Sequence, residues 1–99
     1  MYAIELSEEA EVDLVALRAV DRSRIIKQIE RQLPYEPNRK SRNRKPLRGL
    51  VPPWQHLEPT WELRIGEYRV FYDVDETLKV VAVRAVRHKP PHRTTDEIL

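Results

Sequence analysis

Cysteine is absent from the sequence, which excludes disulfide bonds, thiolate catalysis and cysteine-based metal sites. The three histidines, His56, His88 and His92, do not form a zinc-binding pattern such as H-E-x-x-H, so we expect no metal and no other cofactor. No apolar run approaches the roughly 18 residues of a membrane-spanning helix. Residues 1–10 carry acids in place of the basic start and apolar stretch of a signal peptide. We therefore expect a cytoplasmic protein with no membrane partner.

Charge is abundant but unevenly placed. A chain of 99 residues has room for one hydrophobic core, so we expect a single domain over residues 1–99. Its net charge of +2 hides a run at residues 38–49 with six bases and no acid, while the segments on either side are net acidic. Thirteen of the eighteen bases are arginine, which binds phosphate bidentately. The run indicates either an anionic partner, most commonly nucleic acid, or a solvated loop.

The N-terminal third predicts a strand and a helical hairpin. A short strand at residues 2–6 precedes Ser7, a good N-cap that is followed by acids. Apolar residues at helical spacing then predict a helix to about residue 19. Asp21 is a candidate N-cap for a second helix, which Pro34 ends. Residues 34–59 contain most of the prolines and predict irregular structure, and long segments of this kind are often functional or mobile.

From Thr60 onward, alternation of apolar and polar residues predicts strands. Gly66-Glu67 suits a two-residue type II′ turn, which places Arg64 opposite Arg69. One face of this hairpin is then apolar and should pack on the helices, with Trp61, Leu63, Ile65, Tyr68, Val70 and Tyr72. The opposite face carries Glu62, Arg64, Arg69, Phe71 and Asp73.

The last strand, within residues 78–86, depends on a less certain register. A two-residue turn at Glu76-Thr77 would put Arg84 opposite Arg69, whereas a three-residue turn would reverse the faces. In the first case Val81, Val83 and Ala85 join the apolar face, and Arg84, Val86 and His88 join the polar face. The tail beyond His88 contains a Thr94–Glu97 stretch that could cap one short turn. The predicted fold is α+β, an N-terminal strand and a two-helix hairpin on one face of a mostly antiparallel sheet of three to four strands.

Three arginines on the predicted polar face suggest phosphate binding. Directly opposed like charges destabilise a sheet by a few tenths to about 1 kcal/mol, and a phosphate ligand would relieve the repulsion between Arg64, Arg69 and Arg84. The alternative is an exposed ion-pair ladder in which Glu62 and Asp73 neutralise the cluster.

The same face could perform RNA cleavage. The reaction needs a base for the 2′-hydroxyl, cations for the charge on phosphorus and an acid for the leaving oxygen. The arginines could supply the cations, and His88 the base or the acid. Glu62 is a possible base or a salt-bridge partner, and a histidine near the end of a chain can also be incidental. Trp54, in the proline-rich segment, could stack on an RNA base or cover the edge of the core.

Four motifs, Y-A-I-E-L-S-E-E-A (2–10), K-P-L-R-G (45–49), W-E-L-R-I-G-E-Y-R-V-F-Y-D-V-D (61–75) and V-V-A-V-R-A-V-R-H-K (80–89), resemble the RelE/ParE toxin family. The resemblance spans nearly the whole chain in the same order. It implies the RelE-like, microbial ribonuclease-like fold, with a helical hairpin against an antiparallel sheet. RelE-type members of the family cleave mRNA in the ribosomal A site without a metal.

The resemblance also implies roles for individual residues. Arg69, in G-E-Y-R, matches the family's catalytic arginine, and Arg64 matches a basic residue that holds phosphate. Glu62 stands where one branch has a lysine, which lowers the local positive charge. His88 resembles the acid or base of the branch that uses histidine, and the branch that uses a late tyrosine has no counterpart because no tyrosine follows Tyr72.

The basic run at residues 39–48 resembles the family's surface that contacts ribosomal RNA. We assign RNA or ribosome binding to Arg39, Lys40, Arg42, Arg44, Lys45, Arg48, Arg87 and Lys89. Residues 51–59 form a longer segment than is usual for the family and could cover or reshape the site.

The expected function is therefore a ribosome-dependent endoribonuclease toxin of a type II toxin–antitoxin system, whose partners are the ribosome, mRNA and a cognate antitoxin. The alternatives are a ParE-like inhibitor of DNA gyrase without nuclease activity and a non-toxic, antitoxin-binding member. All three imply an antitoxin, and an acidic one would complement the basic run. DNA would be contacted only through the antitoxin.

Overall fold

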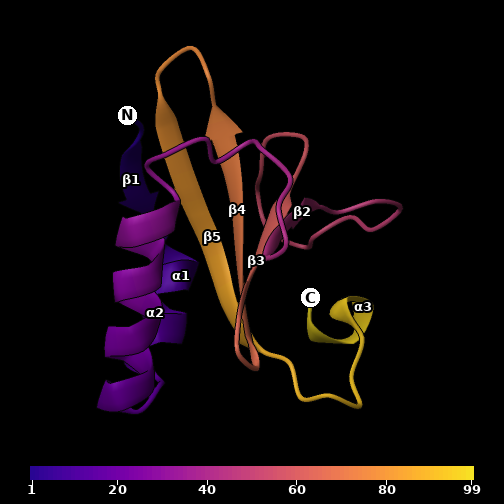
Figure 1. Cartoon of the computed structure of the whole chain (residues 1–99). Helices are drawn as coiled ribbons and strands as arrows, with labels where there is room; N and C mark the ends of the chain where they lie inside the picture. The colour runs from indigo at the N-terminus through magenta and orange to yellow at the C-terminus, as the bar shows by residue number, and fades with distance from the viewer.

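The computed structural model describes all residues of the chain, 1–99, as a five-stranded sheet with a helical hairpin on one side (Figure 1). Its elements are β1 (Ala3–Leu6), α1 (Glu8–Val15), α2 (Ala19–Gln32), β2 (Arg44–Pro46), β3 (Trp61–Ile65), β4 (Tyr68–Asp75), β5 (Val80–His88) and α3 (Thr95–Ile98). The strand order is β1-β5-β4-β3-β2, with β1 parallel to β5 and the other pairs antiparallel. The predicted α+β class and helical hairpin are confirmed. None of the helices is long and apolar enough to span a membrane.

The sheet has five strands where three to four were predicted, because the segment expected to be irregular contributes a strand. Residues 44–46 form β2, which pairs with β3 so that Lys45 lies opposite Glu62. Pro46 is tolerated in β2 because an edge strand does not need every N–H for pairing. This pairing brings the basic run against the sheet.

The helix boundaries follow local capping. The Ser7 hydroxyl accepts a hydrogen bond from the Ala10 N–H at 3.1 Å, as predicted for an N-cap. The prediction of Asp21 as the second N-cap is wrong, since α2 begins at Ala19 and Asp21 lies in its first turn. Asp21 instead accepts hydrogen bonds from Arg18 and from the Tyr68 hydroxyl, both at 3.2 Å. The helix ends before Pro34, as predicted.

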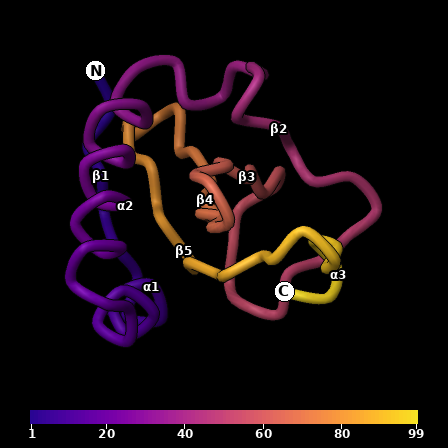
Figure 2. The backbone as a smooth tube through the Cα atoms, turned by 60° about the horizontal axis from the view of Figure 1, so that its bottom comes forward, coloured from indigo at the N-terminus to yellow at the C-terminus, as the bar shows by residue number.

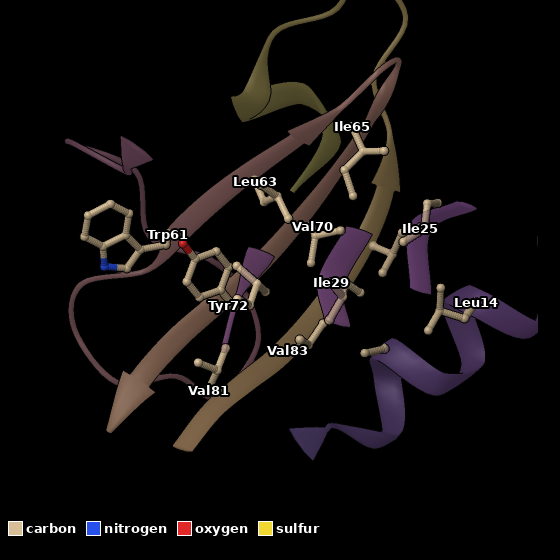
Figure 3. Packing of buried hydrophobic residues seen from close by; sticks show 13 residues of the cluster. Leu14, Ile25, Ile29, Trp61, Leu63, Ile65, Val70, Tyr72, Val81 and Val83 are labelled. Carbon is tan, nitrogen blue, oxygen red and sulfur yellow. The ribbon is translucent and has the colours of Figure 1, made fainter. Parts of the chain in front are cut away.

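The core lies between the helical hairpin and the apolar face of the sheet (Figure 3). The register of β3 and β4 is the predicted one, and Gly66 has the positive φ of +58° that its turn requires. Ile25 and Ile29 of α2 pack on side chains from β3, β4 and β5. The buried cluster comprises Ala10, Leu14, Ile25, Ile29, Leu33, Trp61, Leu63, Ile65, Val70, Tyr72, Val81, Val83 and Val86.

The predicted register of β5 is wrong along the strand, although the predicted faces are correct as far as Val83. The connection from β4 occupies residues 76–79 instead of two residues, which leaves Val81 and Val83 on the apolar face as expected. A bulge at Arg84 then inserts one extra residue between the pairs Tyr72–Val83 and Phe71–Ala85. An inserted residue exchanges the two faces of the rest of a strand.

The exchange places the residues after Val83 differently from the prediction. Val86 joins the core and Ala85 lies opposite Phe71 on the other face. His88 lies opposite Tyr68, and it is Arg87, not Arg84, that faces Arg69.

The second face of the sheet is covered by the β2–β3 connection and the C-terminal tail. Figures 1 and 2 show these segments on the opposite side of the sheet from α1 and α2. Trp54 packs against Phe71 with ring centroids 5.4 Å apart, so it covers this face, and Phe71 is fully buried. The predicted ion pairs of Glu62 and Asp73 exist, but both carboxylates are buried and not exposed. Charged groups thus occupy an interior that the sequence analysis assigned to the surface.

Candidate functional site

A cavity of about 420 Å³ opens where β3, β4, the strand β2 with its preceding loop, and the C-terminal tail meet. We call it the basic pocket. No hydrophobic residue lines it. Its lining comprises Lys40, Ser41, Arg42, Asn43, Arg44, Lys45, Glu62, Arg64, Arg69, Lys89 and Thr95. Seven of these side chains are basic and one is acidic, which makes the cavity suited to a polyanion.

Glu62 and Arg69 are the two buried members of the pocket lining. Glu62 is 3% exposed, and its Oε1 accepts a hydrogen bond from the Thr95 hydroxyl at 2.9 Å and lies 3.4 Å from Arg69 Nε. Its Oε2 is buried without a hydrogen-bond partner in the chain. Buried polar atoms are almost always satisfied, so an unpaired carboxylate oxygen at this point suggests a functional role.

Arg69 is held in place by the turn that precedes its strand. Its Nη1 donates hydrogen bonds to the carbonyls of Gly66 at 2.9 Å and Tyr68 at 2.8 Å. Burial lowers the pKa of the Arg69 guanidinium, the neighbouring Glu62 carboxylate opposes this shift, and Arg64 adds to it. The guanidinium keeps its charge, because the ordinary pKa of arginine is far above neutral. Arg69 is therefore a fixed cation beside a carboxylate with a free oxygen.

The other cations of the pocket differ in whether they have ion-pair or hydrogen-bond partners within the chain. Arg64 lies opposite Arg69 across β3 and β4, is exposed and forms no ion pair. Lys45 and Lys89 also form none. Arg44 is held by the carbonyls of Tyr35 and Glu36 at 3.2 and 2.9 Å, so it also supports the loop. Unpaired cations crowded around one cavity repel each other, and a bound anion would lower that repulsion.

A model of a known protein family matches most of the chain. The family model described as the ParE toxin of the type II toxin–antitoxin system, parDE, matches residues 4–89. The chain belongs to this toxin family. That result confirms the resemblance to RelE/ParE toxins drawn from the sequence motifs. No curated protein matches the sequence significantly.

Several solved structures resemble this ParE-family chain. The toxin–antitoxin complex RelBE2 from Mycobacterium tuberculosis contains a chain with 27% identity and a TM-score of 0.71, covering 89% of this chain and 98% of that one. The isolated RelE toxin from E. coli shows 22% identity and a TM-score of 0.69, covering 96% and 89%. The RelE–RelB complex from Pyrococcus horikoshii shows 24% identity and a TM-score of 0.68, covering 94% and 98%. The last two share the fold.

The pocket brings together most of the residues predicted to act in catalysis or binding. Of the predicted catalytic set, Arg64, Arg69 and Glu62 line it. Of the predicted binding set, it contains Lys40, Arg42, Arg44, Lys45 and Lys89. Arg48 lines an adjoining cavity of about 250 Å³ that shares Lys40, Lys45, Glu62 and Thr95 with the pocket. Arg39 lies outside both cavities and forms an exposed ion pair with Glu36 at 3.0 Å.

Two residues predicted to be catalytic lie elsewhere in this ParE-family chain. The predicted position of Arg84 opposite Arg69 is wrong, since Arg84 sits at the β5 bulge and binds Asp73 through two hydrogen bonds of 2.8 and 3.2 Å. The predicted position of His88 on the polar face is also wrong. His88 lies against the Tyr68 ring, with Nε2 3.1 Å from Glu67, outside the pocket lining. The four-residue connection between β4 and β5 moves Arg84 away from Arg69, and the bulge exchanges the face of His88.

Arg87 faces Arg69 across the sheet but is turned toward other partners. Its guanidinium reaches Asp13 at 2.6 Å and Glu9 at 2.9 Å on α1, and it also donates to the carbonyl of Ile98. Arg87 does not line the pocket, and its ion pairs tie β5 to α1 and to the tail.

Thr95 is a pocket residue that the sequence analysis missed. The expected short turn is present, and Thr94 and Glu97 form a capping box at the start of α3. The hydrogen bond from the Thr94 N–H lowers the pKa of Glu97. This turn aims the Thr95 hydroxyl at Glu62. Only the capping motif was visible in the sequence, because nothing in it indicates that the tail folds back over β3.

Proposed function

We propose that this ParE-family chain is a ribosome-dependent endoribonuclease toxin that cleaves mRNA in the A site, with the scissile phosphate bound in the basic pocket. The observation that supports the proposal is the pocket itself. It has seven cations, no hydrophobic lining and a buried carboxylate with one unpartnered oxygen. Phosphate contacts of this kind position an RNA strand without reading its sequence. The reaction uses side chains alone and needs no metal.

The proposed reaction is transesterification within the RNA strand. The 2′-oxygen attacks the adjacent phosphorus while its proton passes to the carboxylate of Glu62, the one acidic side chain of the pocket lining. Arg69 and Arg64 stabilise the charge on the non-bridging oxygens. The bond from phosphorus to the 5′-oxygen breaks, and the products are a 2′,3′-cyclic phosphate and a 5′-hydroxyl. In this proposal Lys45, which lies opposite Glu62 in the β2–β3 pair, protonates the departing oxygen.

We also propose that the chain has a cognate antitoxin. Two of the similar structures are toxin–antitoxin complexes, and the basic pocket would attract an acidic segment. Such a segment would silence the toxin by occupying the pocket. Operator DNA would be bound by the antitoxin, and the site of action is the cytoplasm.

A second function, inhibition of DNA gyrase without nuclease chemistry, is favoured by one observation. His88 lies outside the pocket, so the combination of Arg64, Arg69 and His88 expected of a nuclease is incomplete. In this alternative the pocket would bind a partner surface or a nucleic-acid backbone without cutting it.

Cleavage mapping on translating ribosomes separates the two functions. Purified wild type, Arg69→Ala and Arg31→Ala would be added to ribosomes translating a defined mRNA, and the new 5′ ends mapped. Gyrase supercoiling would be measured in parallel. Arg31→Ala removes the same charge from an exposed site on α2 outside the pocket and should cut like wild type, whereas Arg69→Ala should not cut. Intact mRNA together with inhibited supercoiling would overturn the nuclease proposal in favour of gyrase inhibition.

A further inference from the structure

A second polar cavity, of about 240 Å³, adjoins the basic pocket at the end of β3. We call it the α2 cavity, because three of its lining residues come from that helix. The lining comprises Arg24, Gln28, Gln32, Asn43, Arg64, Ile65 and Gly66. Asn43 and Arg64 also line the basic pocket, so the two cavities form one continuous surface that leads from the buried Glu62–Arg69 pair toward α2.

Arg24 contributes to this cavity a cation that has no partner within the chain. It is exposed and forms no ion pair or side-chain hydrogen bond, in contrast to Arg18, which pairs with Asp21, and Arg22, which donates to the carbonyl of Leu17 at 3.1 Å. Its guanidinium lies over the β3–β4 turn. A Cβ at Gly66 would stand 2.9 Å from Arg24 Nη2, so the absence of a side chain there leaves room for the guanidinium.

The amide side chains of the cavity present free hydrogen-bonding groups beside the two arginines. Gln32 Nε2 donates to Gln28 Oε1 at 2.7 Å, which fixes the two amides against each other. The Gln28 amide nitrogen and the Gln32 oxygen then remain as one donor and one acceptor. The Asn43 side chain has no hydrogen-bond partner in the chain. A donor and an acceptor side by side complement the edge of an unpaired base, the part of single-stranded RNA that proteins read.

We propose that the α2 cavity binds the nucleotide next to the scissile phosphate, with Arg24 and Arg64 on its phosphate and the amides on its base. The inference rests on the proposed RNA-cleaving function and adds a subsite to it. Arg64 would contact both phosphates, since it belongs to both cavities. Selectivity for the neighbouring base would then come from α2 and Asn43, outside the predicted catalytic and ribosome-binding residues.

Binding of a non-cleavable RNA tests this subsite. The probe is a mixed-sequence hexanucleotide with every 2′-oxygen methylated, which cannot attack phosphorus, and its affinity is measured by fluorescence anisotropy over a salt series. Arg24→Ala should weaken binding about three- to tenfold and reduce the salt slope by about 0.7, the value for one phosphate contact on a single strand. Lys27→Ala removes a charge from the same helix outside the cavity and should stay within about twofold of wild type.

Further binding measurements distinguish failure of the proposed subsite from failure of the RNA-binding function. Gln28→Ala should change the ranking of hexanucleotides that differ at one base, while Arg24→Ala should weaken all of them alike. If Arg24→Ala and Lys27→Ala bind equally well while Arg69→Ala has lost affinity, the subsite is wrong and the basic pocket stands. If wild type does not bind the hexanucleotide even at low salt, the subsite and the RNA-binding function both fail.

Discussion

The two faces of the sheet are buried by different means. The face toward α1 and α2 is covered by aliphatic and aromatic side chains, and its buried cluster contains no charged residue. The opposite face buries Glu62, Arg69 and Asp73 beneath a proline-rich connection and a short tail. Apolar burial stabilises the fold directly, whereas a buried charge is costly unless it is paired.

The difference separates a face that stabilises the fold from the face that we propose is functional. Asp73 is fully matched by Arg84, so this pair is structural. Glu62 keeps one oxygen without a partner, and Arg64 beside it has no counter-ion. Unpaired charges at this position support the proposal that the polar face binds a ligand, and the following predictions separate this use from a contribution to stability.

The largest effect on mRNA cleavage is expected from substitution of Arg69, the buried cation of the polar face. Arg69→Ala should lower the rate of mRNA cleavage on ribosomes by about 10²- to 10³-fold, as is typical when one preorganised donor to developing charge is removed. Because the change also leaves Glu62 buried without its ion-pair partner, Arg69→Ala should lose about 1–3 kcal/mol of stability, so the assay is run at a temperature where the variant is folded. A single-turnover cleavage assay and thermal unfolding, both on purified protein, would check this. Cleavage that persists within tenfold would show that Arg69 does not contact the phosphate.

A substitution on the opposite face, toward α1 and α2, should lower the stability of the protein. Leu63→Ala removes a fully buried side chain next to Glu62 in sequence and should destabilise the protein by about 2–4 kcal/mol. Leu78→Ala, at a site that is 70% exposed, is the matched control and should change the free energy of unfolding by under about 0.5 kcal/mol. Urea unfolding measures both, and equal midpoints would contradict the assigned core.

Removal of Arg84 tests the correction to the β5 register. Arg84→Ala leaves the Asp73 carboxylate buried without its partner and should cost about 1–3 kcal/mol of stability, reduced by the partial exposure of the pair. The affinity for the hexanucleotide should be unchanged, since Arg84 does not line the basic pocket. A specific loss of RNA binding with stability intact would return Arg84 to the functional set.

His56 lies in the β2–β3 connection that covers the polar face, and its protonation should make the free energy of unfolding depend on pH. Hydrogen bonds to the Trp54 carbonyl and to Glu58 raise the pKa of His56, because both favour the protonated ring. This contribution to stability is complete below the ordinary histidine pKa of about 6.5 and is lost as the pH rises through the higher folded value. The stability gap between wild type and His56→Gln should therefore shrink, by under about 1 kcal/mol, from pH 6 to pH 8.5. Unfolding curves at both pH values would measure it, and a gap that grows with pH would contradict the assignment.

The smallest effect is expected at His88. His88→Ala should keep cleavage within about twofold of wild type, since this side chain lies on the Tyr68 side and outside the pocket. His92→Ala, in the exposed tail, is the control. If His88→Ala alone abolishes cleavage, the histidine reaches the site in the bound state, and Glu62 is not the only proton-transfer group.

Local patterns in the sequence were enough to predict the fold and part of the site. Alternation around Gly66 predicted the β3–β4 register and hence the pairing of Arg64 with Arg69. The bulge at Arg84 was not predictable, because no glycine marks its position in the sequence. The position of Lys45 opposite Glu62 and the contribution of Thr95 to the pocket were also not predictable, since both residues come from segments that fold back over the sheet from a distance in sequence.

Glu62→Gln tests most directly the claim that the polar face performs proton transfer at a bound phosphate. Glutamine keeps the size of the side chain and can still accept the Thr95 hydrogen bond, but it cannot take a proton from the 2′-hydroxyl. Single-turnover cleavage on ribosomes should fall by about 10²-fold or more, while affinity for the methylated hexanucleotide stays equal or rises as a negative charge leaves the pocket. Cleavage at the wild-type rate by Glu62→Gln would contradict the account.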